Sequence, residues 1–305
     1  MQNYSTVASR NLIRAAMDML EHAMPVTVLG DFGVQREMPR NQTDTLVFRR
    51  TLPFGAVAAG TTIEGSSRYV GTPVVTPAAL TLAEGTTPTP NTITFQDVTV
   101  TLQNYGILYK YSSKVELMYE DDIPGEMVKQ VGETLAEAME LVRYGVLKAG
   151  SVVIYANGTT RVGINTAISI GTLRKAARTL ESNRAKRITQ RIAPSVNFET
   201  SPIQPAFIVF VHTDMVADVR NLSGFVKVEE YGSFKPVHDR EFGSVEDFRF
   251  ISSPLLAPFL AAGAAVGSTG LLSVGASNID VYPSIVLAAD AWGQVALKGM
   301  KAISP

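Results

Sequence analysis

The side chains that could carry catalytic chemistry are few and scattered. The three histidines, His22, His212 and His238, lie far apart in the sequence, and none has the spacing of a metal site. The chain contains no cysteine, which excludes disulfides, thiol nucleophiles and cysteine-based metal sites. No P-loop, nucleophile elbow or dinucleotide fingerprint occurs. We therefore predict no catalytic residues, no metal site and no cofactor.

One residue spacing in the chain is also found in some oxidoreductases. Tyr231 and Lys235 have the Tyr-x-x-x-Lys spacing used by some dehydrogenases, and Gly263, Gly267 and Gly270 form a glycine cluster. In such enzymes the glycine cluster follows a first strand and precedes the tyrosine, whereas here it comes after the tyrosine. The order of these motifs argues against an enzyme.

Two charged clusters have simple structural interpretations. Glu120, Asp121 and Asp122 could bind a cation, but they precede a predicted helix, whose N-terminus favours carboxylates in any case. Residues 174–191 oppose seven basic side chains to one acid, Glu181, and we interpret them as a solvated helix face. A subunit contact or a surface facing nucleic acid remains an alternative. The basic side chains are those of Arg174, Lys175, Arg178, Arg184, Lys186, Arg187 and Arg191.

The composition points to burial between subunits. Of the 305 residues only 18% are charged, and ordinary soluble domains are nearer a quarter. A net charge of −1 argues against a general nucleic-acid binder. The first twenty residues show no secretory signal. We expect the chain to bury much of its surface against other copies.

The segment from Ile251 to Ile279 carries no charge, and Gly263 and Gly267 have the spacing of a membrane-helix dimer motif. Pro254, Pro258 and the glycines interrupt the run, and its ends lack basic clusters. We predict a buried loop and strand here and not a membrane span.

The first half of the chain predicts an arm and a long β excursion. Residues 9–24 have the periodicity of a short amphipathic helix. Residues 45–54 and 92–111 alternate apolar and polar side chains, with a slip near Gln96 that suggests a bulge. The connecting stretch "LTLAEGTTPTPNTITF" is rich in threonine and nearly uncharged. Because no large core is encoded beside this excursion, a neighbouring copy is the natural surface for it.

The second half begins with the strongest helix signal, over residues 121–150. We then expect strands at 151–156 and 206–212, a helix at 171–186, and a helix at 213–222 capped by Thr213. An exposed loop and one strand should fill 229–253, and two strands should close the chain. The apolar stripe expected on the long helix consists of Met127, Val131, Leu135, Ala138, Val142 and Val146.

Three segments in this order resemble the major capsid proteins of tailed bacteriophages, and more closely the N4-like family with the Hong Kong 97-type fold. They are "TLAEGTTPTPNTITFQDVTVTLQNYGILYKYSSKVEL", "DREFGSVEDFRFISSP" and "VYPSIVLAADAWGQVALKG". The resemblance implies an α+β fold. It also implies an N-terminal arm (1–47), an extended loop (48–112), a peripheral domain around the long helix (113–160 and 276–305) and an axial domain (161–275).

The resemblance further implies a structural role: hexamers and pentamers tiling an icosahedral shell around packaged double-stranded DNA, bound without sequence specificity. Assembly would occur in the host cytoplasm, with a separate scaffolding protein, a portal and a decoration protein as partners. The loop near Glu229 to Asp239 would point at the capsomer axis. The expected subunit-interface residues are Thr61, Glu64, Arg68, Tyr69, Glu84, Thr87, Glu230, Tyr231 and Lys235.

Two other functions stay open at this point. The same fold serves encapsulin nanocompartments, which package enzymes in place of DNA. The uncharged run also permits a different oligomeric surface protein, such as a tail component.

Overall fold

The computed structural model describes fifteen stretches of the chain and leaves the intervening residues undescribed. The described residues are 27–38, 44–51, 61–63, 66–68, 81–85, 87–88 with 90, 95–118, 122–150 with 152–183, 185–192, 200–232 with 234–267, and 271–275 with 277–297. The predicted helix over 9–24 lies outside them. Two compact units emerge, each assembled from segments distant in sequence. Unit 1 comprises Met1–Leu46, Val100–Leu147 and Trp292–Pro305, and unit 2 comprises Val47–Thr99 and Lys148–Ala291.

Unit 1 is dominated by one long helix. Its described elements are the 3₁₀ helix η1 (Leu29–Phe32), β1 (Val34–Met38), α2 (Ser113–Met118), α3 (Ile123–Lys148) and β12 (Gly293–Leu297). Helix α3 has 26 residues and confirms the predicted long helix. Its first turn is held by Asp122, whose Oδ1 accepts the backbone N–H of Gly125 at 3.2 Å. The carboxylate thus serves the helix N-terminus, as expected for this position.

The buried face of α3 differs from the predicted apolar stripe. Its buried residues are Pro124, Gly132, Ala136, Glu140 and Tyr144. By contrast, Val142 and Val146 of the stripe are 41% and 66% exposed. The stripe therefore does not define the side of α3 that packs within one copy of the chain.

A short parallel pairing completes unit 1. Strands β1 and β12 pair with Val34 opposite Gly293 and Met38 opposite Leu297. Gly33 precedes this pairing at a position where a Cβ would stand only 2.9 Å from the ring of Trp292, so a larger residue here would require the indole to shift.

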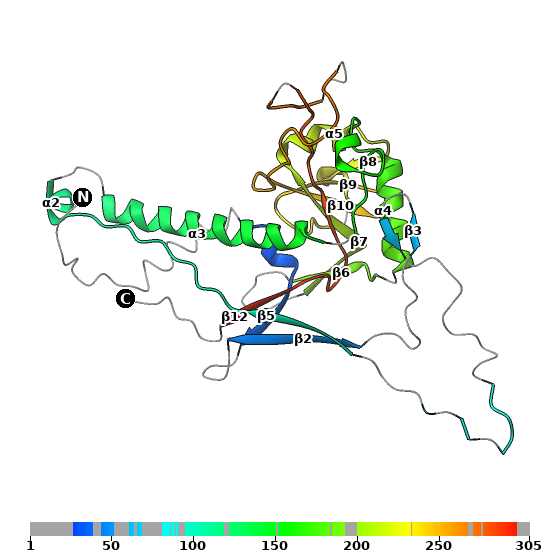
Figure 1. The fold of residues 1–305 in the computed structure, drawn as a ribbon. Coiled ribbons are helices and arrows are strands. Elements are labelled where there is room, and N and C mark those ends of the chain that lie inside the picture. Colours follow the sequence, from blue (N-terminus) through cyan, green and yellow to red (C-terminus); the bar gives the residue numbers. More distant parts are fainter. Residues whose placement is uncertain are drawn as a thin grey trace. The chain divides into compact units, whose positions relative to one another are not determined.

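Unit 2 is built on a six-stranded mixed sheet (Figure 1) with the order β11-β7-β10-β9-β8, and β6 also pairs with β7. Strands β7 and β10 are parallel, and the other pairs of the sheet are antiparallel. The strands are β6 (Ile188–Ile192), β7 (Thr200–His212), β8 (Phe225–Lys227), β9 (Glu241–Val245), β10 (Phe248–Ser253) and β11 (Ile285–Leu287). The helical elements of unit 2 are η3 (Arg161–Gly163), α4 (Ile170–Ser182), η4 (Thr213–Met215), α5 (Val216–Arg220) and η5 (Val228–Glu230).

The core of unit 2 forms on β7 and β10. Residues 206–211 read as a continuous apolar run, which is typical of a strand buried on both faces, and all six are buried. Leu173 of α4 joins Phe207, Phe248 and Phe250 in one cluster, against which Ala176 and Leu180 also pack. The predicted buried strand and the helix beside it are thereby confirmed.

Several boundaries differ from the sequence prediction. Residues 152–156 form no strand, and α4 ends at Ser182, short of the predicted 186. Thr213 opens η4 but does not cap it, because the side chain of His212 accepts the Asp214 N–H. Residues 229–253 contain two strands, β9 and β10, where one was expected. The turn between them is tight enough that Glu246 takes a positive φ of 50°.

The β excursion is described only in part. β2 (Thr45–Thr51) and β5 (Phe95–Thr101) form one two-stranded sheet, and β3 (Thr61–Ile63) and β4 (Ser66–Arg68) form another. The predicted strands at 45 and 95 are confirmed, but β5 stops at Thr101 and residues 102–112 have no regular secondary structure.

The uncharged run forms the end of β10 and then a loop, as predicted, but the loop is not buried throughout, because Leu260, Leu272 and Val274 are exposed. After Ser253 the chain forms turns and the isolated bridges Phe259–Val281 and Ala265–Asn278. Within the described residues, no helix has the length and apolar character needed to cross a membrane.

Candidate functional site

The most unusual surface of the described residues is an extended apolar segment, residues 102–118, called here the apolar ribbon. Its first eleven residues lack regular secondary structure and lead into α2. Leu108 is 77% exposed, and Leu117 and Met118 of α2 are 84% and 75% exposed. Tyr105, Ile107 and Tyr109 are exposed as well. Such a surface is suited to binding another chain.

Helix α3 carries a second exposed apolar surface. Met139, Leu141, Val142 and Val146 are all exposed on it. The first three lie between the buried positions Ala136, Glu140 and Tyr144, and Val146 lies two residues beyond Tyr144. Because large apolar residues on a long helix normally face a core, this pattern indicates a partner that the described residues of one copy do not supply.

The opposite side of α3 anchors the segment that leads into η1. The buried carboxylate of Glu140 accepts the backbone N–H groups of Val28 at 2.8 Å and Leu29 at 2.6 Å. Arg143 lies against the same carboxylate at 3.4 Å. The Gly30 carbonyl accepts the side-chain amide of Gln294 at 2.7 Å. The segment that contains η1 is thereby fixed to α3 through Glu140 and to β12 through Gln294.

A buried polar cluster supports the loop between η5 and β9. The hydroxyl of Tyr231 donates to Glu241 Oε1 at 2.8 Å, and the backbone N–H of Val237 donates to Glu241 Oε2. Arg249 lies 3.6 Å from the same carboxylate and donates to the carbonyl of Lys235 at 3.0 Å. Burial raises the pKa of Glu241, which the hydrogen bonds and Arg249 only partly offset. Burial likewise raises the pKa of Tyr231.

This cluster shows what two of the predicted interface residues contact within the chain. Tyr231 points inward and fixes the loop, and Lys235 contributes its backbone carbonyl while its side chain is exposed. Glu230 is exposed at the end of η5. In this chain, the two residues with the Tyr-x-x-x-Lys spacing therefore stabilise the loop between η5 and β9.

The remaining predicted interface residues lie in the β excursion. Thr61 pairs with Arg68 across β3 and β4. Glu84 and Thr87 are exposed. Glu64 and Tyr69 lie outside the described residues. A role between subunits stays a prediction for all nine residues.

The basic segment 174–191 is partly neutralised within the chain. Arg174 pairs with Glu246 on the β9–β10 turn, and Arg187 pairs with Asp247 at 2.7 Å and with Glu181 at 2.6 Å. The hydrogen bond to Arg174 lowers the pKa of Glu246. These cations therefore hold a turn of the sheet, a function that the sequence alone did not suggest.

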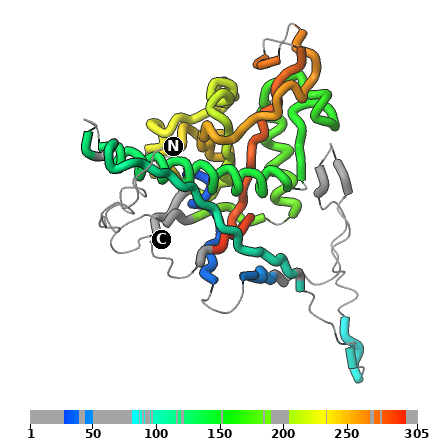
Figure 2. Tube along the Cα trace, turned by 60° about the vertical axis from the view of Figure 1, so that its left-hand side comes forward, coloured from blue at the N-terminus to red at the C-terminus, as the bar shows by residue number. Residues whose placement is uncertain are grey.

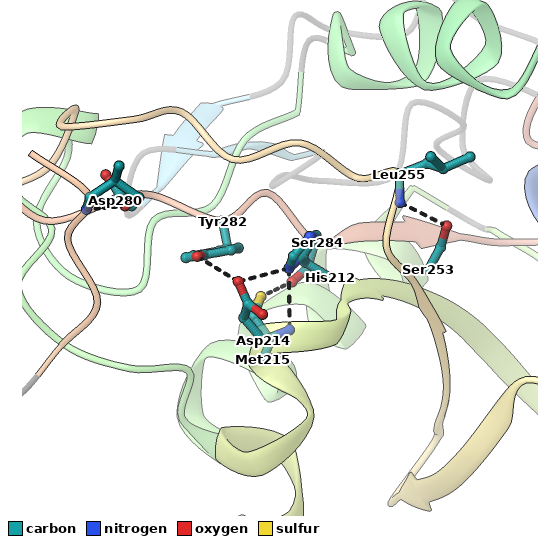
Figure 3. Close-up of polar contacts among 9 residues, drawn as sticks. His212, Asp214, Met215, Ser253, Leu255, Asp280, Tyr282 and Ser284 are labelled. Carbon is teal, nitrogen blue, oxygen red and sulfur yellow. Dashed lines mark hydrogen bonds and ion pairs between the residues drawn. The ribbon is translucent and has the colours of Figure 1, made fainter. Parts of the chain in front are cut away.

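His212 has a structural role, as predicted. Its Nδ1 accepts the Asp214 N–H at 3.2 Å, and Tyr282 donates its hydroxyl to the Asp214 carboxylate at 2.9 Å (Figure 3). The rings of His212 and Tyr282 pack at 5.3 Å. Burial, reinforced by Asp214, raises the pKa of Tyr282 to about 12. In the described part of the chain, no group of three or more His, Asp or Glu side chains could hold a metal ion.

Solved structures with related shapes include phage heads. One is the head structure of Helicobacter pylori bacteriophage KHP40, with a TM-score of 0.45 and 14% identity, covering 83% of this chain and 59% of that chain. Another is the asymmetric unit of the bacteriophage PhiM1 mature capsid, with a TM-score of 0.43 and 10% identity, covering 99% and 91%.

Comparison of the amino-acid sequence matches the chain to phage capsid proteins. A major capsid protein of Pseudomonas phage KPP21 is 24% identical over 260 residues, which cover 79% of this chain. The chain spans 64% of that relative's length. The family model described as "Phage capsid protein" matches residues 97–294, from β5 to β12. Because this match covers well over half of the sequence, the chain belongs to the phage capsid protein family.

Proposed function

We propose that this chain is the major capsid protein of a tailed bacteriophage, of the N4-like family and with the Hong Kong 97-type fold. It acts as a structural protein and not as an enzyme. Hexamers and pentamers of the chain tile the icosahedral head shell of the virion. The shell is assembled in the host cytoplasm and encloses packaged double-stranded DNA.

The observation that carries this proposal is the apolar ribbon. Fully burying one large apolar side chain is worth about 1.5–3 kcal/mol, so a run of exposed tyrosine, leucine and methionine side chains favours association strongly. Leu108, Leu117 and Met118 are among the most exposed apolar residues of the described chain. Membership of a capsid family makes further copies of the same chain the natural partners.

The domain roles follow from the same proposal. Residues 1–47 form an arm, 48–112 an extended loop over a neighbour, 113–160 with 276–305 a peripheral domain, and 161–275 an axial domain. A separate scaffolding protein, a portal and a decoration protein complete the list of partners. The net charge of −1 suits a container that holds DNA without binding it tightly.

Negative-stain electron microscopy of the purified full chain tests the proposal. We expect capsomer rings or closed shells, and we expect Leu108→Asp combined with Leu117→Asp to abolish them. Asn104→Asp is the matched control, because it adds a charge at an exposed polar position of the same ribbon. A parent chain that stays monomeric at high concentration, with and without added scaffolding protein, would contradict the proposal. A double variant that assembles like the control would show that the apolar ribbon is not a contact between subunits.

A further inference from the structure

Between β10 and β11 the chain has a run without charges, residues 254–279, whose described residues 254–267, 271–275 and 277–279 form a loop that leaves the sheet of unit 2 and returns towards β11. It is called here the uncharged loop. Figures 1 and 2 both show it, in orange, extending away from the strands. Three of its apolar side chains are strongly exposed: Leu260 at 61%, Leu272 at 56% and Val274 at 77%.

The base of the uncharged loop is firmly held. Asp280 is 4% exposed, and its carboxylate accepts the backbone N–H of Ala261 at 2.7 Å and of Val274 at 2.8 Å. The hydroxyl of Ser253 accepts the Leu255 N–H where the loop begins (Figure 3). One carboxylate thus ties two distant points of the loop to the strand-like segment that closes it.

Further contacts fix the sides of the loop. Arg161 stacks on the ring of Phe259 at 3.7 Å. Gly263 packs so closely that a Cβ would lie 3.0 Å from the carbonyl oxygens of Ile164 and Ile279. Beside the base, Tyr282 donates to Asp214 next to His212 (Figure 3). The loop is therefore a preorganised surface, which loses little entropy when it binds.

The absence of charge favours an identical partner. Where copies of a chain meet about a rotation axis, each residue near the axis faces the same residue of another copy, so any charge would meet its own sign. The uncharged loop avoids this repulsion and offers leucine and valine in place of charges. The loop at η5 differs, because it exposes Glu229 and Glu230 side by side. A partner of opposite charge has nothing to recognise on residues 254–279.

We propose that the uncharged loop packs against the same loop of a second copy of this chain, through Leu272 and Val274. The proposal rests on the proposed assembly of the chain and identifies one of its contacts. It assigns the like-on-like contact to this loop, and not to the loop near Glu229 to Asp239.

The absence of native cysteine makes disulfide trapping a clean test. Assembled particles of Val274→Cys and of Leu272→Cys should give disulfide-linked dimers on mild oxidation, seen on non-reducing gels. Val226→Cys is the control, since Val226 is an exposed valine on β8. Particles that form normally and cross-link no more than the control would overturn this proposal and leave the proposed function intact.

Charge pairing gives a second test of the same contact. Val274→Lys and Val274→Glu should each assemble at least tenfold less than the parent, because like charges would meet, and an equal mixture of the two should recover assembly. Thermal unfolding of each variant should match that of the parent, which excludes misfolding. Normal assembly of either variant alone, or no recovery in the mixture, would overturn the proposal. Failure of the parent itself to assemble would instead contradict the proposed function. Lipid vesicles that co-sediment with the parent but not with Val274→Lys would indicate a membrane partner. That result would also overturn the like-on-like contact.

Discussion

The carboxylate of Glu140 accepts the backbone N–H of Leu29 at 2.6 Å, and both residues are completely buried. One charged side chain in the middle of α3 thus satisfies backbone donors at the start of η1, far away in sequence. Buried donors without a partner are costly, so this contact is expected to be a major determinant of unit 1.

Glu140→Ala should lower the free energy of unfolding by about 3 kcal/mol, because it leaves the N–H groups of Val28 and Leu29 unpaired. Glu140→Gln should cost less, since its amide oxygen still accepts a hydrogen bond. Urea unfolding followed by fluorescence measures this directly, because the chain's single tryptophan, Trp292, lies in unit 1. Glu137→Ala, at an exposed position of the same helix, should change little. Equal effects of the two alanine variants would contradict the assigned role.

Two glycine substitutions should act in opposite directions. A Cβ on Gly243 would stand close to the ring of Phe225 and 2.7 Å from the carbonyl of Val226, so Gly243→Ala should destabilise the β8–β9 pairing by about 1–3 kcal/mol. Gly145 on α3 has open space around it, and Gly145→Ala should stabilise the helix by about 0.5–1 kcal/mol. Thermal unfolding followed by circular dichroism gives both signs, and a Gly243→Ala variant as stable as the parent would show that the close approach is relieved without cost.

The raised pKa of Glu241 predicts a pH dependence of stability. The folded state holds this proton more tightly than the unfolded chain, where the pKa is near 4.5. The favourable contribution is therefore fully present below about pH 4.5 and is lost as the pH rises through the raised pKa. Unfolding free energies measured from acid to neutral pH should decline more in the parent than in Glu241→Gln. Parallel profiles would show that Glu241 does not titrate differently in the two states.

Asp280 should control the order of the uncharged loop. Asp280→Ala removes the acceptor for Ala261 and Val274, so chymotrypsin should cut near Leu260 and Leu272 at least several-fold faster than in the parent. Asp280→Asn retains one acceptor oxygen and should be intermediate. Trypsin serves as the control, because the loop contains no lysine or arginine. Unchanged chymotrypsin cleavage in Asp280→Ala would mean that other contacts suffice to hold the loop.

The elements with strong local signals were predictable from the sequence. Helix α3 lies within the predicted 121–150 because acids precede it, Lys148 ends it and Gly150 follows it. Strand β7 was recognisable from its continuous apolar run. The segment "SVVIYA" carries the same kind of apolar signal and yet forms no strand over its described residues, because no neighbouring strand pairs with it.

The surfaces that matter for assembly were harder to predict. Periodicity identified an apolar stripe on α3 but could not tell that Val146 faces outward while Glu140 is buried. Burial of that carboxylate depends on backbone donors at residues 28 and 29, which no local pattern records. The support for the loop at Tyr231 likewise depends on Arg249, which lies on strand β10, outside that loop.

The parallel pairing of β1 with β12 has a consequence for synthesis on the ribosome. Val34 is synthesised before all of unit 2 and its partner Gly293 after all of unit 2, so unit 1 can close only once residues 47–291 have been made. The apolar ribbon and most of α3 belong to that unit. A chain that stops before β12 consequently lacks the strand that completes unit 1, and its apolar ribbon and α3 then belong to an incomplete unit.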